Sequence, residues 1–121
     1  MKITRFEDIE AWKAARKLTQ AISQATRKRS WSSDLMLVRQ TRKCAVSAMA
    51  NIAEGFDSGT DPEFIRFPRI AYRSMSELQS HLYVALDERH IDPPTFEALY
   101  AQSRETKAIM GGFMRYLRRS P

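Results

Sequence analysis

The sequence has little cysteine, glycine and proline, and it lacks a long apolar run. Of its 121 residues one is cysteine, four are glycine and five are proline. The single thiol, Cys44, excludes an internal disulfide, and the low glycine and proline contents argue against a β-rich or disordered chain. No apolar run approaches the roughly 20 residues that span a membrane, and the first residues lead into charged side chains rather than an apolar signal segment. We therefore expect a single domain over residues 1–121, located in the cytoplasm.

Signatures of metal binding and catalysis are also scarce. His81 and His90 are nine residues apart, so they do not share one helix face. Glu77 precedes His81 by four residues rather than by the three of a bundle di-metal motif, and that pair occurs once. Cys44 lies in an apolar run with no evident histidine base, which favours a small core residue over a reactive thiol, and no glycine-rich phosphate loop occurs. We expect no metal, no cofactor and no enzymatic activity.

What the chain does contain is an uneven distribution of charge. The net charge is +6, but residues 11–53 alone have a balance of +8, with Asp34 as their one acid, and the rest of the chain has a balance of −2. Such asymmetry suggests either a polyanionic partner, RNA or DNA, or a solvated basic face that only aids solubility, and the charge pattern favours neither over the other. Basic side chains bind the phosphates of a nucleic acid through charge, with little sequence preference. We see no aromatic side chains beside them on which unpaired bases could stack. The predicted nucleic-acid-binding residues are Lys13, Lys17, Lys28, Arg39, Arg42 and Lys43.

Four segments have apolar residues at spacings of three and four, which predicts four long helices. Their expected spans are 6–29, 34–54, 61–90 and 92–119. Residues 30–33 form a connection in which Trp31 folds back on the core, and Ser32 or Ser33 caps the second helix. Asp61 and Asp92, each followed by proline, are typical helix starts. Together the segments predict an all-α, up-down-up-down antiparallel four-helix bundle.

Three positions inside these helices call for special geometry. Gly55 is expected to end the second helix in the left-handed conformation. Pro68 lies inside the third helix and predicts a kink, or else a break after a short first helix. Gly111 and Gly112 weaken the fourth helix, which is tolerable if another backbone packs closely against them.

The second helix carries a line of polar side chains in a segment of small apolar residues. Ser47, Asn51 and Glu54 are separated by steps of four and three, which place them on one helix face. We predict that they form a polar seam with Ser74 and Glu77 of the third helix. A buried pair of catalytic carboxylates, Glu54 and Glu77, is the alternative. The small residues around them leave this helix apolar on too many sides for one monomer to cover, so we expect a homo-oligomer.

Several segments resemble one protein family. The opening residues 6–15, the central residues 40–55 ending in Asn51-Ile52-Ala53-Glu54-Gly55, and residues 63–67 and 74–78 match its pattern. The chain resembles the four-helix-bundle proteins named for intervening sequences in bacterial 23S ribosomal RNA genes, and it is similar to the accessory variability protein of diversity-generating retroelements. It departs from them at Pro68, where the family has an ordinary helix residue.

The resemblance implies a ring-shaped homopentamer. Its retroelement relatives bind nucleic acid and a reverse transcriptase through a basic surface. With the charge asymmetry, this leads to the hypothesis of a non-enzymatic, oligomeric adaptor for RNA or DNA. The alternative is a protein-interaction scaffold, for example for a reverse transcriptase, with no nucleic-acid binding of its own.

Overall fold

The computed structural model describes residues 3–58 and 61–119, and all regular structure in these ranges is helical. A short 3-10 helix, η1 (Phe6–Asp8), precedes α1 (Glu10–Thr26), and a single-turn helix, α2 (Arg29–Ser32), follows it. Three longer helices complete the chain, namely α3 (Leu35–Phe56), α4 (Asp61–Asp87) and α5 (Pro93–Arg119). None of the helices in the described ranges combines the length and the apolar character needed to cross a bilayer.

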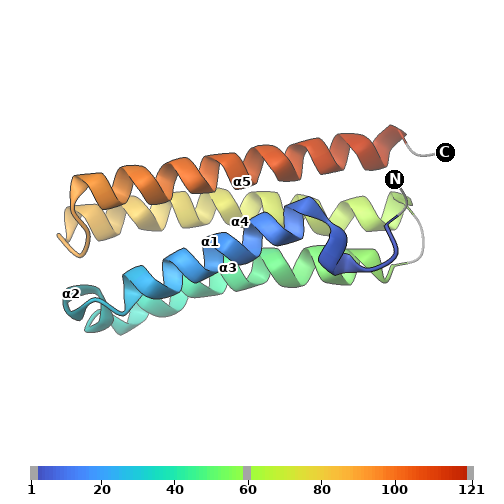
Figure 1. The fold of residues 1–121 in the computed structure, drawn as a ribbon. Helices are drawn as coiled ribbons and strands as arrows, with labels where there is room; N and C mark the ends of the chain where they lie inside the picture. The colour runs from blue at the N-terminus through green and yellow to red at the C-terminus, as the bar shows by residue number, and fades with distance from the viewer. Residues whose placement is uncertain (1–2, 59–60, 120–121) are drawn as a thin grey trace.

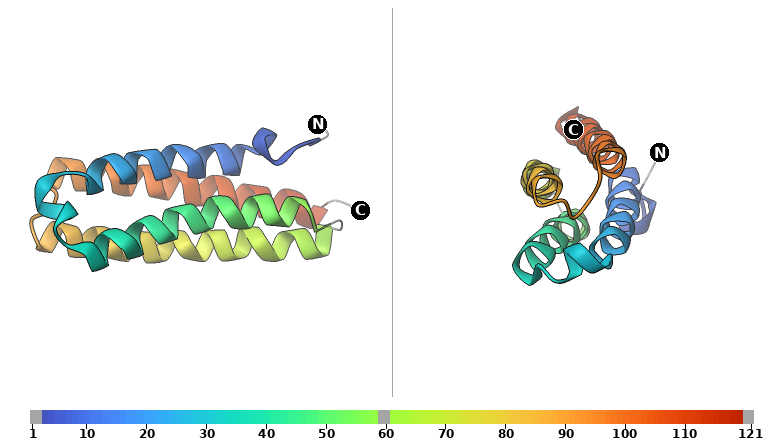
Figure 2. Two further views of the ribbon diagram at one scale, coloured as in Figure 1. Left: turned by 90° about the horizontal axis from the view of Figure 1, so that it is seen from below. Right: turned by 90° about the vertical axis from the view of Figure 1, so that its left-hand side faces the viewer.

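Helices α1, α3, α4 and α5 lie side by side along one axis (Figure 1). Viewed from the end, α3 lies between α1 and α4, and α5 closes the bundle by packing on both α4 and α1 (Figure 2). The connections alternate between the two ends of the bundle, so η1 and the end of α5 lie at one end and α2 lies at the other (Figure 1). The chain is therefore an all-helical bundle, as the sequence predicts.

The core is built from the apolar stripes that the spacing predicts. Each long helix turns one stripe inward, and burying a side chain the size of leucine stabilises the fold by about 1.5–3 kcal/mol. Fully buried members include Leu18, Ile22, Ile52, Met75, Leu78, Leu82 and Met110.

The first predicted helix is shorter than expected at both ends. Ile9 has an extended backbone (φ −75°, ψ 121°) that separates η1 from α1, and its side chain is only 1% exposed. Lys28 is extended as well, and it turns the chain into α2. Trp31 on α2 is completely buried, which confirms that it folds back on the core. The prediction of one helix over 6–29 is wrong because burying Ile9 and Trp31 requires the chain to change direction at both places.

Helix α3 begins with a cap other than the predicted serines. Asp34 is the N-cap, and its carboxylate accepts a hydrogen bond from the Leu37 amide at 3.3 Å. Ser32 and Ser33 instead donate to the carbonyls of Arg29 and Ser30, because both serines belong to the end of α2. Asp92 plays the same part for α5 by accepting from the Thr95 amide at 2.9 Å.

Gly55 does not end α3 in a left-handed conformation, so that prediction is wrong. The helix continues through Phe56, and its C-cap residue, Asp57, is right-handed. Gly55 is buried, and a Cβ there would lie 2.8 Å from the ring of Phe64 and 2.9 Å from Cβ of Phe67. Its role is therefore to let α3 and α4 approach closely.

Gly111 and Gly112, unlike Gly55, have room for a side chain. A Cβ at Gly111 would meet only side chains at ordinary contact distance, 3.6 Å from Arg115 and 3.7 Å from Tyr72. At Gly112 a Cβ would lie 3.6 Å from Arg115. Among the described residues, no backbone of a neighbouring helix therefore packs closely against these two glycines to offset their cost.

Helix α4 passes through Pro68 without a break. The helix runs from Asp61 to Asp87, three residues short of the predicted end, and Pro68 is buried within it. The alternative of a break is wrong, and the kink stays a prediction. After α4 the chain turns at Arg89, the single non-glycine residue in the described ranges with a positive φ, 60°. Residues 59–60, together with the side chain of Asp61 at the predicted helix start, fall outside what the structure describes.

Candidate functional site

A groove of about 950 Å³ runs between α1 and α5 and holds part of the predicted basic surface. Lys13 and Lys17 line it from α1, and Gln102, Thr106 and Ile109 line it from α5. Its charged lining residues are Arg5, Glu7, Glu10, Lys13, Arg16, Lys17 and Glu105. The groove thus mixes four basic with three acidic side chains.

Exposed ion pairs partly neutralise the basic side chains at the start of this groove. The Lys13 ammonium lies 3.3 Å from the Glu10 carboxylate, and Arg5 lies 3.6 Å from Glu7 and 3.7 Å from Asp8. Pairs this exposed contribute little to stability and exchange readily with other partners. A phosphate can therefore compete for Lys13, while Lys17 has no ion-pair partner in the described part of the chain.

Trp12 adds an aromatic surface to the same groove, which the sequence interpretation missed. The Trp12 side chain is half-buried and lines the groove beside Lys13. The ring of Phe6 meets it edge-on at a centroid distance of 5.2 Å, and the Arg16 guanidinium lies 5.8 Å from its centroid. From its spacing in the sequence, Trp12 is one more member of the apolar stripe. Its position at the groove depends on how α1 is rotated against α5, which the spacing does not show.

The remaining predicted basic residues lie elsewhere. Arg39 and Arg42 are exposed on α3, and Lys43 lines a separate cavity of about 300 Å³ between α3 and α4. Lys28 lies near the opposite end of the bundle, where Asp92 has a lowered pKa, first because of its hydrogen bonds from Thr95 and more weakly because of the positive charge of Lys28. The structure therefore divides the six residues among different parts of the surface instead of joining them around one groove.

The polar seam is distributed between the interior and the surface. The Asn51 amide donates to the Ser47 carbonyl at 2.8 Å and to the Ser47 hydroxyl at 3.1 Å, and both side chains are half-buried. Ser74 donates to the carbonyl of Ile70 in its own helix at 3.1 Å. Glu54 and Glu77 are both exposed, so the alternative of a buried carboxylate pair is wrong.

The α3–α4 cavity borders a cluster of three possible metal ligands. The ligand atoms of Cys44, Glu77 and His81 all lie within 4.8 Å of one another. Cys44 is 4% exposed, and burial, followed by the charge and hydrogen bond of Glu77, raises the pKa of its thiol to about 12. Sequence spacing identified Glu77 and His81 as neighbours on one helix but gave no sign that Cys44 faces them from another.

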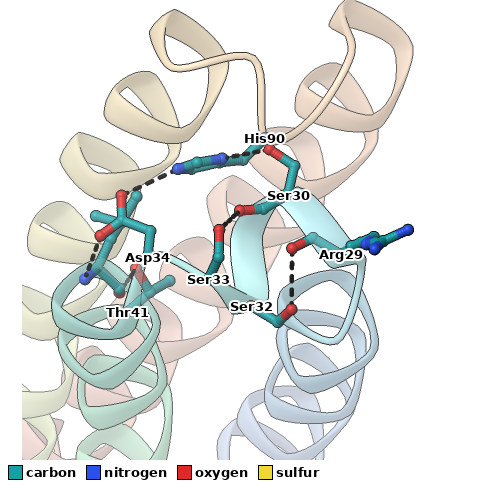
Figure 3. A network of polar contacts seen from close by, with 8 residues as sticks. Arg29, Ser30, Ser32, Ser33, Asp34, Thr41 and His90 are labelled. Atoms are coloured by element: carbon teal, nitrogen blue, oxygen red, sulfur yellow. Dashed lines mark hydrogen bonds and ion pairs between the residues drawn. The ribbon is translucent and has the colours of Figure 1, made fainter.

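A second polar network lies at the end of the bundle that carries α2 (Figure 3). The Ser30 hydroxyl lies 2.8 Å from Nδ1 of His90, and Nε2 of His90 lies 3.0 Å from the Asp34 carboxylate. The His90 ring stacks on Trp31 with a centroid distance of 6.3 Å. These contacts tie α2 and the start of α3 to the loop between α4 and α5, and they join residues up to 60 positions apart in the sequence.

Comparison with known proteins identifies the family of this chain. A family model described as 23S rRNA-intervening sequence protein matches residues 7–112. The match includes α1 through α4 and most of α5. A comparison with curated proteins gives no match.

Proposed function

Because the chain belongs to the 23S rRNA-intervening sequence protein family, we propose that it is a non-enzymatic, oligomeric adaptor that binds RNA or DNA. The observation that supports this proposal is the α1–α5 groove, which Lys13, Arg16 and Lys17 line together with Trp12. Basic side chains bind phosphates through charge, and an aromatic ring beside them provides a stacking surface for an unpaired base. Single-stranded segments are therefore the preferred ligands.

Sequence preference in such binding is weak. Lysines contact the phosphate backbone, which is the same at every position, and the groove carries a single Trp ring. Each phosphate contact releases counterions, so affinity falls as salt rises.

The assembly we propose is a closed ring of five up-down-up-down bundles, with the subunit number taken from the family resemblance. Apolar side chains on α3 support an interface between chains. Leu35 is 59% exposed, Met36 71% and Val46 53%, and burying them against a second copy would remove this area from water. A ring would repeat the basic groove, so that individually weak phosphate contacts act together.

The same exposed residues favour a second candidate, a scaffold that binds a protein partner such as a reverse transcriptase. That function predicts capture of a protein partner that survives nuclease treatment. The adaptor function predicts that nuclease removes the bound material.

Titration of a fluorescent single-stranded oligonucleotide at two salt concentrations tests the proposed function. The wild-type chain should bind at low salt and more weakly at high salt. Reversing Lys13 and Lys17 to glutamate should weaken binding and reduce the salt slope by about one unit for each lost phosphate contact. Helicity measured by circular dichroism should not change, because both side chains are exposed.

A matched control separates the groove from overall charge. Reversing Arg69 and Arg73, which are exposed on α4, changes the net charge by the same amount. This variant should bind nearly as well as the wild-type chain. Equal losses in the two variants would contradict a specific role for the groove, and no binding by the wild-type chain at low salt would refute the adaptor function.

A further inference from the structure

Three side chains of metal-ligand type meet between α3 and α4. Glu77 and His81 are four residues apart, so they lie on one face of α4, and Cys44 faces them from α3. The Glu77 carboxylate lies 3.8 Å from Nε2 of His81, and the three ligand atoms fit within 4.8 Å. Thiolate, imidazole and carboxylate are the groups that bind zinc in proteins.

The spacing is close to that of a metal site. Zinc binds these atoms at about 2.0–2.3 Å in a tetrahedron, which places the ligand atoms about 3.4 Å from one another. Glu77 and His81 are 3.8 Å apart and no pair among the three exceeds 4.8 Å, so closure around an ion requires a pair of ligand atoms to approach by at most about 1.4 Å.

Nε2 of His81 is the second observation that indicates a ligand. This atom is buried, and it has no hydrogen-bond partner among the described residues. An unpartnered buried nitrogen destabilises the fold, because it has lost its hydrogen bonds to water and gained none in the protein. A bound cation would satisfy it, because the neutral ring nitrogen is an electron-pair donor.

The surroundings provide room for a fourth ligand. Cys44 and Glu77 both line the cavity of about 300 Å³, together with Gln40, Lys43, Ser47 and Ser74. This volume is large enough for water molecules, and polar side chains line it. Three protein ligands with one open position are typical of zinc sites that retain a bound water.

We propose that Cys44, Glu77 and His81 form a zinc-binding site between α3 and α4, with a water from the adjoining cavity as fourth ligand. The Cys44 thiol gives up its proton to solvent as the metal binds, so that one thiolate and one carboxylate balance the charge of the ion. Sulfur and nitrogen ligands favour zinc over magnesium or calcium, which prefer oxygen alone. The site lies within one chain, and it is independent of the proposed nucleic-acid binding.

Titration of the full-length, chelator-treated chain with Co²⁺ tests the proposal. Cobalt occupies tetrahedral zinc sites and gives visible absorption bands, and a bound thiolate adds a charge-transfer band in the near ultraviolet. Cys44 is the only cysteine, so this band reports on the proposed site. We expect one Co²⁺ per chain, its displacement by Zn²⁺, and a rise in melting temperature when Zn²⁺ is added.

Three variants identify the ligands. Cys44→Ser should remove the charge-transfer band, and Glu77→Gln and His81→Gln should each weaken Co²⁺ binding by at least tenfold. Glu77 has a side chain that is 64% exposed, so Glu77→Gln should keep the wild-type helicity even if Cys44→Ser disturbs the core. The matched control, Glu54→Gln, removes an exposed carboxylate from α3 and should bind like the wild-type chain. Absence of the thiolate band in the wild-type chain, or equal affinity in Glu77→Gln and Glu54→Gln, would overturn the proposal.

Discussion

Replacing Gly55 by alanine tests the close approach of α3 and α4. The new Cβ would lie 2.9 Å from Cβ of Phe67, an atom fixed to the backbone of α4, and 2.8 Å from the ring of Phe64. The Phe64 ring is itself packed between the rings of Phe56 and Phe113, at centroid distances of 6.3 Å and 5.4 Å. Relief of these contacts therefore requires a shift of α4 as well as of a side chain.

Two opposing effects determine how much Gly55→Ala changes the free energy of unfolding. Inserting a methyl group into a packed site costs about 1–3 kcal/mol, whereas alanine gains at most about 1 kcal/mol over glycine in a helix. Since Gly55 lies in the last turn of α3, the gain is at the lower end. We expect a net loss of about 1–2 kcal/mol in the free energy of unfolding, which lowers the melting temperature by about 3–6 °C per kcal/mol for a chain of this size.

Gly111→Ala is the matched control, since Gly111 also lies inside a helix. Its Cβ would make contacts no closer than 3.6 Å, so only the gain in helix propensity remains. This variant should be more stable than the wild-type chain by up to about 1 kcal/mol. Urea unfolding of the three proteins, followed by circular dichroism at equal protein concentration, measures both changes. If the Gly55→Ala variant has a free energy of unfolding equal to or higher than that of the wild-type chain, the interpretation that Gly55 allows the close approach of α3 and α4 is refuted.

Two further predictions concern pH and assembly. Hydrogen bonds from His90 and from the Leu37 amide lower the pKa of Asp34 below its usual value of 3.8. The ionised Asp34 carboxylate therefore contributes its full stabilisation above pH 3.8, and this stabilisation is lost as the pH falls through the lowered pKa of the folded state. Asp34→Asn should therefore show a smaller loss of melting temperature between about pH 6 and about pH 2 than the wild-type chain, and identical pH profiles would contradict this. Light scattering should give about 70 kDa for five chains of 14.0 kDa, and Met36→Glu with Val46→Glu should lower that mass because charges resist burial. A monomeric wild-type chain would refute the assembly argument, and a dimer would refute the ring.

Much of the fold can be predicted from local sequence because helix formation depends on neighbours three and four residues apart. The stripes through Leu18 on α1, Ile52 on α3 and Leu78 on α4 identify three of the long helices and their buried faces. The start at Asp92 is also local, since its carboxylate caps an amide three residues away. Where tertiary packing competes with these signals, as at Ile9 and Gly55, the predicted helix boundaries are wrong.

The candidate sites depend on contacts that local spacing does not encode. The sequence by itself determined the helices, the inward stripes and the excess of basic residues in its first half. Tertiary structure decided that Trp12 lies beside Lys13 and Lys17 in a groove with α5, while Lys43 lies in a different cavity. It also brought Cys44 to Glu77 and His81, more than 30 residues away. The physical reason is that periodicity fixes which side of a helix is buried, but the rotation and pairing of helices depend on how all the side chains pack together.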